Sequence, residues 1–269
     1  QGCIMKNLWE MELRRVVHNK GTWLVLLIMM MMVCTDGYLF HELSRDSGKY
    51  VYPNLFLQGW LPMDYQFVFG SLFRAMLPLF ASIPFGASYY SDKTSGYIKN
   101  ICTKVSPRKY RIVKYMVTFL SGTISIMIPL AFSLMLVLTY LPVLKPQPFA
   151  YQGLADYAFL RLFYLHPVWY SLFYILIDGM FGGLAAVCSL CVSDYARSRF
   201  SVLVLPFTVY LLGGAFLEQL NLSWLSIYDM VNPLQECPVN QYLIGITIVI
   251  GIVLTVYWFC FKQTKEDIL

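Results

Sequence analysis

Few residues of this 269-residue chain have the types and spacing that chemistry requires. The sequence contains no glycine-rich phosphate loop of the GxxxxGK[ST] kind, no HExxH and no GxSxG, which are the spacings of phosphate sites, zinc hydrolases and serine nucleophiles. Its three histidines, His18, His41 and His166, are expected on different loops or sides. We therefore expect no catalytic residue, cofactor or metal ion in this chain.

Two groups in one apolar run, residues 168–192, could still hold a metal ion or a proton. Cys188 and Cys191 have CxxC spacing, but no second pair or nearby histidine accompanies them, so packing is the favoured interpretation. Asp178 lies well inside the run, where an acid costs about 3 kcal/mol or more unless it is paired, hydrated or protonated. It marks either a pathway or inter-helix contact, or a hydrogen-bonded Asp-Gly in a loosened helix. Arg74 and Glu218 lie near the ends of their runs and are expected to snorkel.

A basic island, residues 90–114, separates two long apolar runs. On a helix over residues 92–105, apolar and polar residues fall on opposite faces. The apolar arc holds Tyr97, Ile98, Ile101, Cys102 and Val105, and the other face holds Lys93, Lys99, Asn100, Thr103 and Lys104. Pro107 suits the first turn of the next helix, which carries Arg108 and Lys114 into the bilayer interface. The pattern predicts a helix on the membrane surface, where a soluble partner could bind.

Composition indicates that these residues belong to a membrane protein. Hydrophobic residues make up 58% of the chain and charged residues 13%, with a mean hydropathy of +0.59, which is too apolar for a soluble domain. The net charge of +5 could suggest nucleic acid, but the basic residues cluster at the ends of apolar runs. Membrane lipids, and not nucleic acid, are the expected surroundings.

The apolar runs predict an all-α protein with a single membrane domain over residues 1–269. Six runs are near the length of about 20 residues that a helical span needs. The predicted spans are residues 22–40, 70–90, 116–141, 168–192, 201–219 and 241–261. With both termini inside, 15 of the 20 basic residues fall on the inner side. Both termini are therefore expected in the cytoplasm.

Two further patterns concern helix packing. Residues 4–20 predict an amphipathic helix along the inner leaflet, with Glu12 as an imperfection on its apolar side. Its apolar face is expected to hold Met5, Trp9, Leu13 and Val16, opposite Asn7, Arg14 and Arg15. In the fourth span, Gly179, Gly182, Gly183 and Ala186 give small residues at helical spacing, which allows close approach of another helix, either within one subunit or between subunits.

The basic island also resembles a known family. Asp92-Lys93, the run from Gly96 to Ile101, Ser106, Arg108-Lys109 and Lys114 are similar to the motif between spans two and three of the membrane permeases of ATP-binding-cassette (ABC) exporters of the type-2 class, ABC-2. The layout is similar along nearly the whole chain, including Asn232-Pro233 before the last span. Tyr97 and Pro107 depart from the family pattern.

The resemblance implies that residues 92–105 form a coupling helix, which docks on a separate ABC ATPase subunit. Its contact residues would be Asp92, Lys93, Gly96, Tyr97, Ile98, Lys99, Asn100, Ile101, Lys104 and Arg108. ATP and Mg would bind the partner, which would be present in two copies beside a second copy of this permease or a related one. The expected location is the bacterial cytoplasmic membrane.

The expected activity is export of an amphipathic or hydrophobic substrate, peptide-like (a bacteriocin or other antimicrobial peptide) or lipid-like. One alternative is a peptide-sensing or immunity module that reports to an ATPase without net transport. Another is a scaffold or channel that works without an ATPase. The sequence does not separate these functions.

Overall fold

The computed structural model describes residues 2–46, 56–64, 67–103, 105–146, 158–234 and 239–262. All regular secondary structure in these ranges is helical, which confirms the predicted all-α fold class for the described part of the chain. In chain order the elements are α1 (Gly2–His18), α2 (Lys20–Asp46), η2 (Leu61–Met63), α3 (Val68–Ser82), α4 (Ser88–Thr94), α5 (Tyr97–Cys102), α6 (Pro107–Leu138), α7 (Leu160–Leu165), α8 (Pro167–Val192), α9 (Arg199–Gln219), η4 (Ser223–Leu225), α10 (Ile227–Met230), α11 (Gln241–Val256) and the π-helix η5 (Tyr257–Lys262).

Five of the described helices are long and apolar enough to cross a membrane. They cover Lys20–Leu43, Pro107–Leu138, Pro167–Val192, Arg199–Gln219 and Gln241–Phe261, close to the predicted first, third, fourth, fifth and sixth spans. The third span begins earlier than the predicted residue 116. Pro107 is the first residue of α6, after Ser106, and the helix then continues without a break. The chain is thus an all-helical protein with several membrane-spanning segments.

The predicted second span, residues 70–90, is not one continuous helix. It consists of α3, with 15 residues, and the start of α4, separated by a turn over residues 83–87. Pro84 in this turn lacks an amide donor, and its carbonyl accepts a hydrogen bond from Asn19 Nδ2. Gly86 lies so close to α8 that a Cβ would be 2.9 Å from Ser189 Cβ. The turn is therefore held between the start of α2 and α8.

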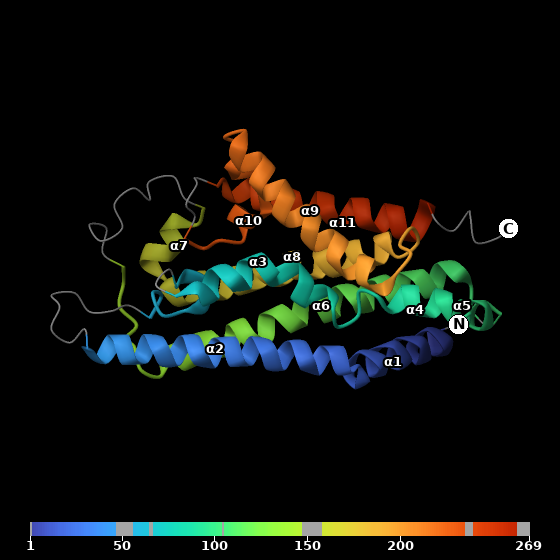
Figure 1. Cartoon of the computed structure of the whole chain (residues 1–269), viewed down its shortest axis with the longest axis horizontal. Coiled ribbons are helices and arrows are strands. Elements are labelled where there is room, and N and C mark those ends of the chain that lie inside the picture. Colours follow the sequence, from blue (N-terminus) through green and yellow to red (C-terminus); the bar gives the residue numbers. More distant parts are fainter. Residues whose placement is uncertain are drawn as a thin grey trace.

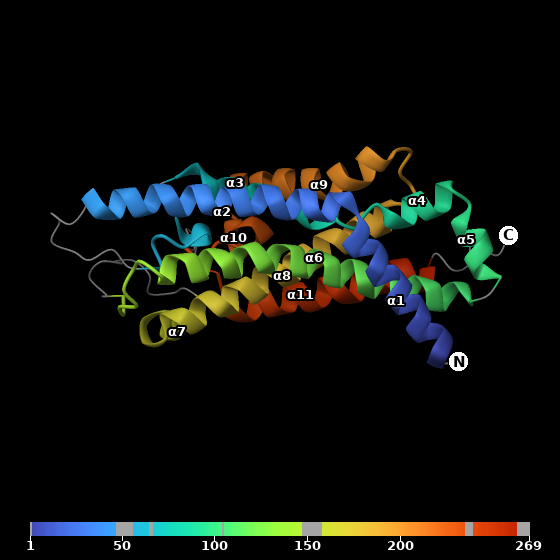
Figure 2. The ribbon, with the colours of Figure 1, turned by 90° about the horizontal axis from the view of Figure 1, so that it is seen from below.

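Helices α6 and α8 form the centre of the bundle and pack along small residues (Figure 2). A Cβ on Gly122 would lie 2.7 Å from Ala186 Cβ and 3.0 Å from the Gly182 carbonyl oxygen. A Cβ on Gly183 would overlap Thr123 Oγ1. The small-residue stripe predicted in the fourth span therefore serves packing within the chain.

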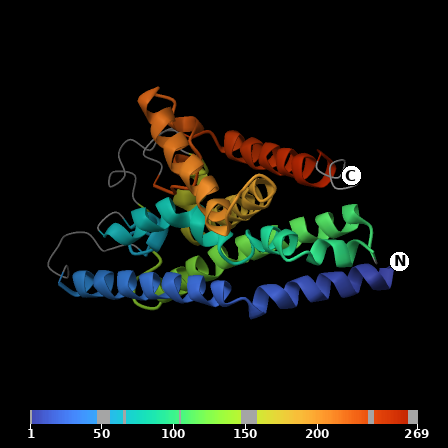
Figure 3. The same cartoon turned by 45° about the vertical axis from the view of Figure 1, so that its right-hand side comes forward.

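The other long helices surround this pair (Figure 1). α2 packs on α6, α3 lies against both central helices, and α9 and α11 each contact α8. α9 and α11 diverge from one another along the bundle, as Figure 3 shows. We call the end at which α1, α4 and α5 lie the basic end.

At the opposite end, residues 56–64 insert into the bundle. Trp60 is fully buried and its Nε1 donates to the Leu130 carbonyl of α6 over 3.4 Å. The Leu61 amide donates to Ser133 Oγ, and Arg74 of α3 donates to the Pro62 carbonyl over 2.9 Å. This connection is consequently part of the core.

Candidate functional site

The basic island folds as two short helices, which corrects the single helix predicted over residues 92–105. α4 ends at Thr94 and α5 begins at Tyr97, with Ser95 and Gly96 between them. Gly96 has a φ of +72°, and its amide bonds to the Lys93 carbonyl, as expected for a glycine that ends a helix in left-handed conformation. We call residues 88–103 the elbow.

The two faces predicted for the island are present on α5. Lys99, Asn100 and Thr103 are exposed, whereas Ile98 and Ile101 are half-buried and pack against a buried apolar cluster at the basic end. That cluster includes Leu8 of α1, Tyr89 of α4, Tyr110 and Val113 of α6, and Phe259 of η5. Lys104 lies outside the described residues. The elbow thus presents a polar face outward while its apolar side is fixed to the bundle.

A buried group of charges, which we call the ionic anchor, fastens the elbow. It consists of Glu12 and Arg15 of α1, Asp92 of α4, and Tyr110 and Lys114 of α6. Lys114 Nζ lies 2.9 Å from Glu12 Oε2 and 2.7 Å from Asp92 Oδ2. Arg15 Nη1 lies 2.9 Å from Glu12 Oε1 and 3.1 Å from Asp92 Oδ2, and the Tyr110 hydroxyl donates to Asp92 Oδ2 over 2.6 Å.

The charges of the ionic anchor balance, with two carboxylates and two cations. Lys114 and Glu12 are fully buried and Asp92 is 2% exposed. A buried charge of this kind is tolerated only when it is paired and hydrogen-bonded, and the loss of one partner is costly. Lys114 Nζ also lies 4.5 Å from the centre of the Phe85 ring, which further stabilises the cation. Three helices distant in sequence are thereby joined at one point.

The ionic anchor shifts the titration of the groups that lie outside the spans. Burial raises the pKa of Asp92, but hydrogen bonds and positive charge from Arg15 and Lys114 outweigh it and leave the pKa below its usual value. For Arg15, burial lowers the pKa, but Asp92 and Glu12 raise it further, so the guanidinium stays charged. Both groups are ionised at neutral pH.

The anchor reaches α5 through Tyr97. The Arg15 guanidinium lies 5.2 Å from the centre of the Tyr97 ring, and the Tyr97 hydroxyl donates to Met11 Sδ. Burial, and then the negative charge of Glu12, raise the pKa of Tyr97. The first residue of α5 is therefore held by α1.

Arg111 forms a second link between α6 and its neighbours. The side chain is 2% exposed, its Nη1 donates to the Phe259 carbonyl over 3.0 Å, and its guanidinium lies 5.5 Å from the Tyr89 and Phe259 ring centres. The exposed Arg108 lies over the ring of Phe261 at 5.5 Å. Both arginines join α6 to η5.

The structure separates the residues predicted to contact an ATPase into two groups. Asp92 is buried in the ionic anchor, so its carboxylate is not available to a soluble partner. Lys93 is exposed and pairs with Asp194 Oδ1 over 3.2 Å, after the end of α8. Lys99, Asn100 and Arg108 are exposed, while Gly96, Tyr97, Ile98 and Ile101 are half-buried.

Four residues of the anchor were absent from that predicted contact set: Glu12, Arg15, Tyr110 and Lys114. The signal for Glu12 was its position on the apolar side of residues 4–20. The predicted apolar face of α1 is correct in part: Trp9 and Val16 pack against the buried cluster, but Leu8 and Glu12 also face inward while Leu13 is exposed. The side chain of Met5 lies outside the described residues. Glu12 pairs with Lys114 on the inner side of the helix, and Leu13 and Val17 lie on the outer surface.

Asp178 forms a separate polar feature inside the bundle. It is fully buried, and among the described residues neither carboxyl oxygen has a hydrogen-bond partner. Arg74, which we expected to snorkel, is 4% exposed and donates to the Pro62 carbonyl, because the inserted segment 56–64 covers it. The Tyr210 hydroxyl of α9 donates to the Arg74 carbonyl over 3.1 Å.

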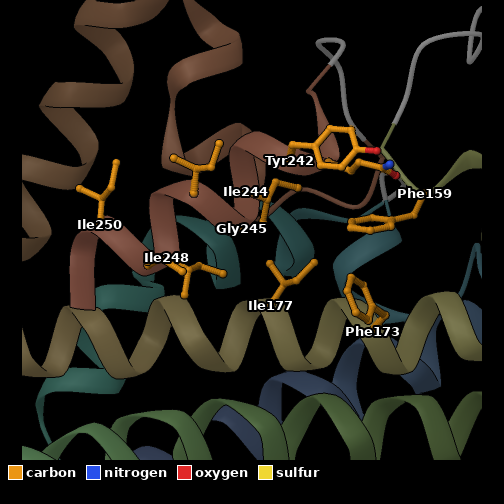
Figure 4. A pocket seen from close by; sticks show the side chains of 11 residues that line it. Phe159, Phe173, Ile177, Tyr242, Ile244, Gly245, Ile248 and Ile250 are labelled. Carbon is orange, nitrogen blue, oxygen red and sulfur yellow. The ribbon is translucent and has the colours of Figure 1, made fainter. Parts of the chain in front are cut away.

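Two apolar grooves flank α11. The first, of about 670 Å³, lies between α8 and α11 below Phe159; Phe173 and Ile177 line one side and Ile244 and Ile248 the other (Figure 4). The second, of about 540 Å³, lies between α9 and α11 above α8 and α3. Cys188 lines the second groove, and Cys191 Sγ lies 3.9 Å from the Thr255 carbonyl, contacts that fit a packing role for the CxxC pair.

These features define an all-helical, multi-pass membrane protein with an exposed polar elbow and a buried ionic anchor at its basic end. Comparison with protein-family models, with curated proteins and with solved structures finds no match.

Proposed function

We propose that this chain is the membrane-spanning subunit of an ATP-driven exporter of the ABC-2 type. The observation that carries the proposal is the combination of an exposed polar face on α5 with a rigid attachment of the elbow to α1 and α6. The attachment has the properties that a coupling element needs, because a force on Lys99 and Asn100 would move helices and not a loop.

In this proposal a separate ATPase subunit binds the elbow and hydrolyses ATP with Mg. α3 and the α4 region complete the second of six crossings, and both termini lie in the cytoplasm of a bacterial cell. Closure of two ATPase subunits would displace α5, and the ionic anchor would pass the displacement to α6 as a rigid-body motion. Asp92 acts here as a positioning residue within the anchor.

Two copies of the permease, or this chain with a related one, would enclose the pathway. Only 11% of the apolar window of α9 is buried within the chain, which leaves a broad surface for a second copy or for lipid. The apolar lining of the two grooves favours an amphipathic or hydrophobic substrate, of peptide or lipid-like chemistry.

The test is purification of the chain from its host in mild detergent, with quantification of any bound ATPase. The native chain should retain the ATPase, and Lys99→Glu combined with Asn100→Ala should lose it without loss of membrane insertion. Lys20→Glu is the matched control, because Lys20 is also exposed but lies at the start of α2. Failure of the native chain to retain any ATPase would contradict the proposal and favour a scaffold or channel.

Transport into sealed vesicles separates export from sensing. Export requires ATP-dependent movement of the substrate, and the movement should stop in the Lys99→Glu, Asn100→Ala variant. Retention of an ATPase without movement of any candidate substrate would instead support the peptide-sensing module.

A further inference from the structure

A buried pair of acids joins α2 to the segment that inserts into the bundle. We call this segment, residues 56–64, the insert. Asp64 follows η2 at the end of the insert and is fully buried, and Asp36 of α2 is 1% exposed. The side chains of these two residues are hydrogen-bonded to each other. The pair therefore fastens the insert to the first long helix of the bundle.

A hydrogen bond between two carboxyl groups requires a proton. Ionised carboxylates only accept hydrogen bonds, whereas a protonated carboxyl has one O–H donor. Two carboxylates in contact would repel each other, and water would not solvate them here because both residues are buried. One proton removes the repulsion and supplies the donor. The contact between Asp36 and Asp64 therefore requires a proton.

The other hydrogen bonds of the insert to the bundle do not depend on such a proton. Their donors are the Trp60 indole, the Leu61 amide and the Arg74 guanidinium. None of these groups loses its proton near neutral pH. Among these contacts, the one between Asp36 and Asp64 is thus the one that a change of pH near neutrality would alter.

Titratable and charged side chains of neighbouring elements also surround the pair. Arg74 of α3 is bound to a carbonyl of the insert. Burial, and then the negative charge of Asp36 and Asp64, raise the pKa of Tyr140, after α6, to about 12, so this phenol is neutral at pH values near neutrality. The His41 ring of α2 lies 5.0 Å from the Tyr140 ring, edge to face. Histidine commonly titrates between about pH 5 and 8, so His41 is the neighbour that an experiment must separate from the pair.

We infer that Asp36 and Asp64 form a proton-binding site, and that the one proton they share fixes the insert to α2. Without this proton, two buried carboxylates would repel each other and the contact would open. Because the fixed form carries the proton, a low pH favours the fixed insert and a rise in pH favours its release. The site requires only that the chain is folded in a membrane, so it does not depend on the proposed ATPase or on export.

The experiment measures amide hydrogen exchange of the insert by mass spectrometry, with the whole chain in phosphatidylcholine nanodiscs. An ordinary aspartate has a pKa of about 3.9, so rates are compared at about pH 6 and about pH 9, where only an unusual carboxyl still titrates. Asp36→Asn supplies a permanent N–H donor to Asp64. At each pH the native rate is divided by the Asp36→Asn rate, which cancels the intrinsic pH dependence of exchange. This ratio should rise about tenfold from about pH 6 to about pH 9, since a hydrogen bond to a charged group is worth that factor in local opening.

Three further variants separate the pair from other groups. Asp64→Asn should behave as Asp36→Asn does, because either amide replaces the shared proton, and it provides the same test if Asp36→Asn does not fold. Asp178→Asn is the matched control, since Asp178 is also a fully buried acid but lies on α8. Asp178→Asn and His41→Gln should both show the same pH response as the native chain.

Infrared spectra test the proton itself. The C=O stretch of a protonated carboxyl should decrease between about pH 6 and about pH 9 in the native chain and in Asp178→Asn. This decrease should be absent in Asp36→Asn, in which the pair no longer has two carboxyl groups.

An exchange ratio that does not change with pH for Asp36→Asn or for Asp64→Asn would overturn the inference. Loss of the pH response in His41→Gln would also overturn it, because the response would then belong to the histidine. Loss of the response in Asp178→Asn would contradict it in the same way, since the proton would lie on α8.

Discussion

Lys114 of α6 and Asp92 of α4 form an ion pair of 2.7 Å inside the protein, with both side chains almost completely buried. Lys114 also pairs with Glu12 of α1 at 2.9 Å, so one ammonium group joins three helices. The elbow, whose exposed face is formed by α5, is therefore held both by the ionic anchor and by apolar packing.

Replacement of Lys114 by methionine should destabilise the chain by about 3–5 kcal/mol, because Glu12 and Asp92 would keep two buried negative charges with only Arg15 as a cation. Denaturant titration in mixed micelles measures the change. Lys93→Met is the control: Lys93 pairs with Asp194 at the surface, and its loss should cost less than about 1 kcal/mol. Equal effects of the two changes would contradict a special role for the buried pair.

Glu12→Gln should loosen α1 from the bundle, because the neutral amide leaves Lys114 with only one anionic partner. Loosening can be followed by the rate of thiol labelling in a Leu8→Cys variant, with the native cysteines replaced, since Leu8 is 4% exposed. We expect labelling to become about tenfold faster, which corresponds to about 1.4 kcal/mol. Glu10→Gln serves as the control because Glu10 is exposed and pairs with the exposed Arg14. No difference between the two changes would show that packing alone holds α1.

The pKa of Asp92 predicts how the anchor responds to acid. The pKa in the folded chain is below the value of about 3.9 expected in the unfolded chain. The stability contributed by ionised Asp92 is therefore complete above the unfolded pKa and is lost as the pH falls through the folded pKa. Unfolding measurements should show no loss from this group between about pH 5 and 8, and a steep loss below about pH 4.

Asp92→Asn should remove the contribution of Asp92 to this acid transition while it lowers stability at neutral pH. Glu10→Gln should leave the transition in place, because Glu10 is exposed. An Asp92→Asn chain with the same acid slope as the native chain would mean that other carboxyl groups cause the loss.

The periodic features were predictable from the sequence because they depend on near neighbours. The lengths of the apolar runs predicted the five helices that are long enough to cross a membrane, and Pro107 predicted the start of α6. The faces of α5 and the small-residue stripe of α8 also follow from helical spacing. The break at Gly96 was missed because the apolar arc begins only at Tyr97, so the spacing of apolar residues carries no signal at the turn itself.

The ionic anchor was not predictable in the same way. Glu12 and Lys114 are separated by 102 positions and Arg15 and Asp92 by 77. No local pattern encodes such partners, and Glu12 alone looked like a defect in an amphipathic helix. Arg74 was misjudged for a similar reason, since its burial depends on the insertion of residues 56–64.

Gly122→Ala should weaken the central helix pair, because the new methyl group would lie 2.7 Å from Ala186 Cβ and 3.0 Å from the Gly182 carbonyl oxygen. Overpacking of this kind costs about 1–3 kcal/mol. Gly245→Ala is the control, since nothing lies within 4 Å of its Cβ and alanine favours the helix. Stability measured for the two variants should change in opposite directions, and a stabilised Gly122→Ala chain would show that α6 and α8 can separate without cost.

Gly96→Ala tests the elbow by backbone conformation alone. No atom lies within 4 Å of a Cβ at this position, so any effect comes from the φ of +72°, at which alanine costs about 1–2 kcal/mol. Gly96→Asn should cost less, because asparagine tolerates left-handed backbone. Gly213 has equally free space around a Cβ but lies in the helix α9, so Gly213→Ala should not lower the stability of the chain. If the elbow transmits motion as proposed, ATPase binding should be strongest in the native chain, weaker in Gly96→Asn and weakest in Gly96→Ala. ATPase binding by Gly96→Ala equal to that of the native chain would mean that α5 does not need the turn at Gly96.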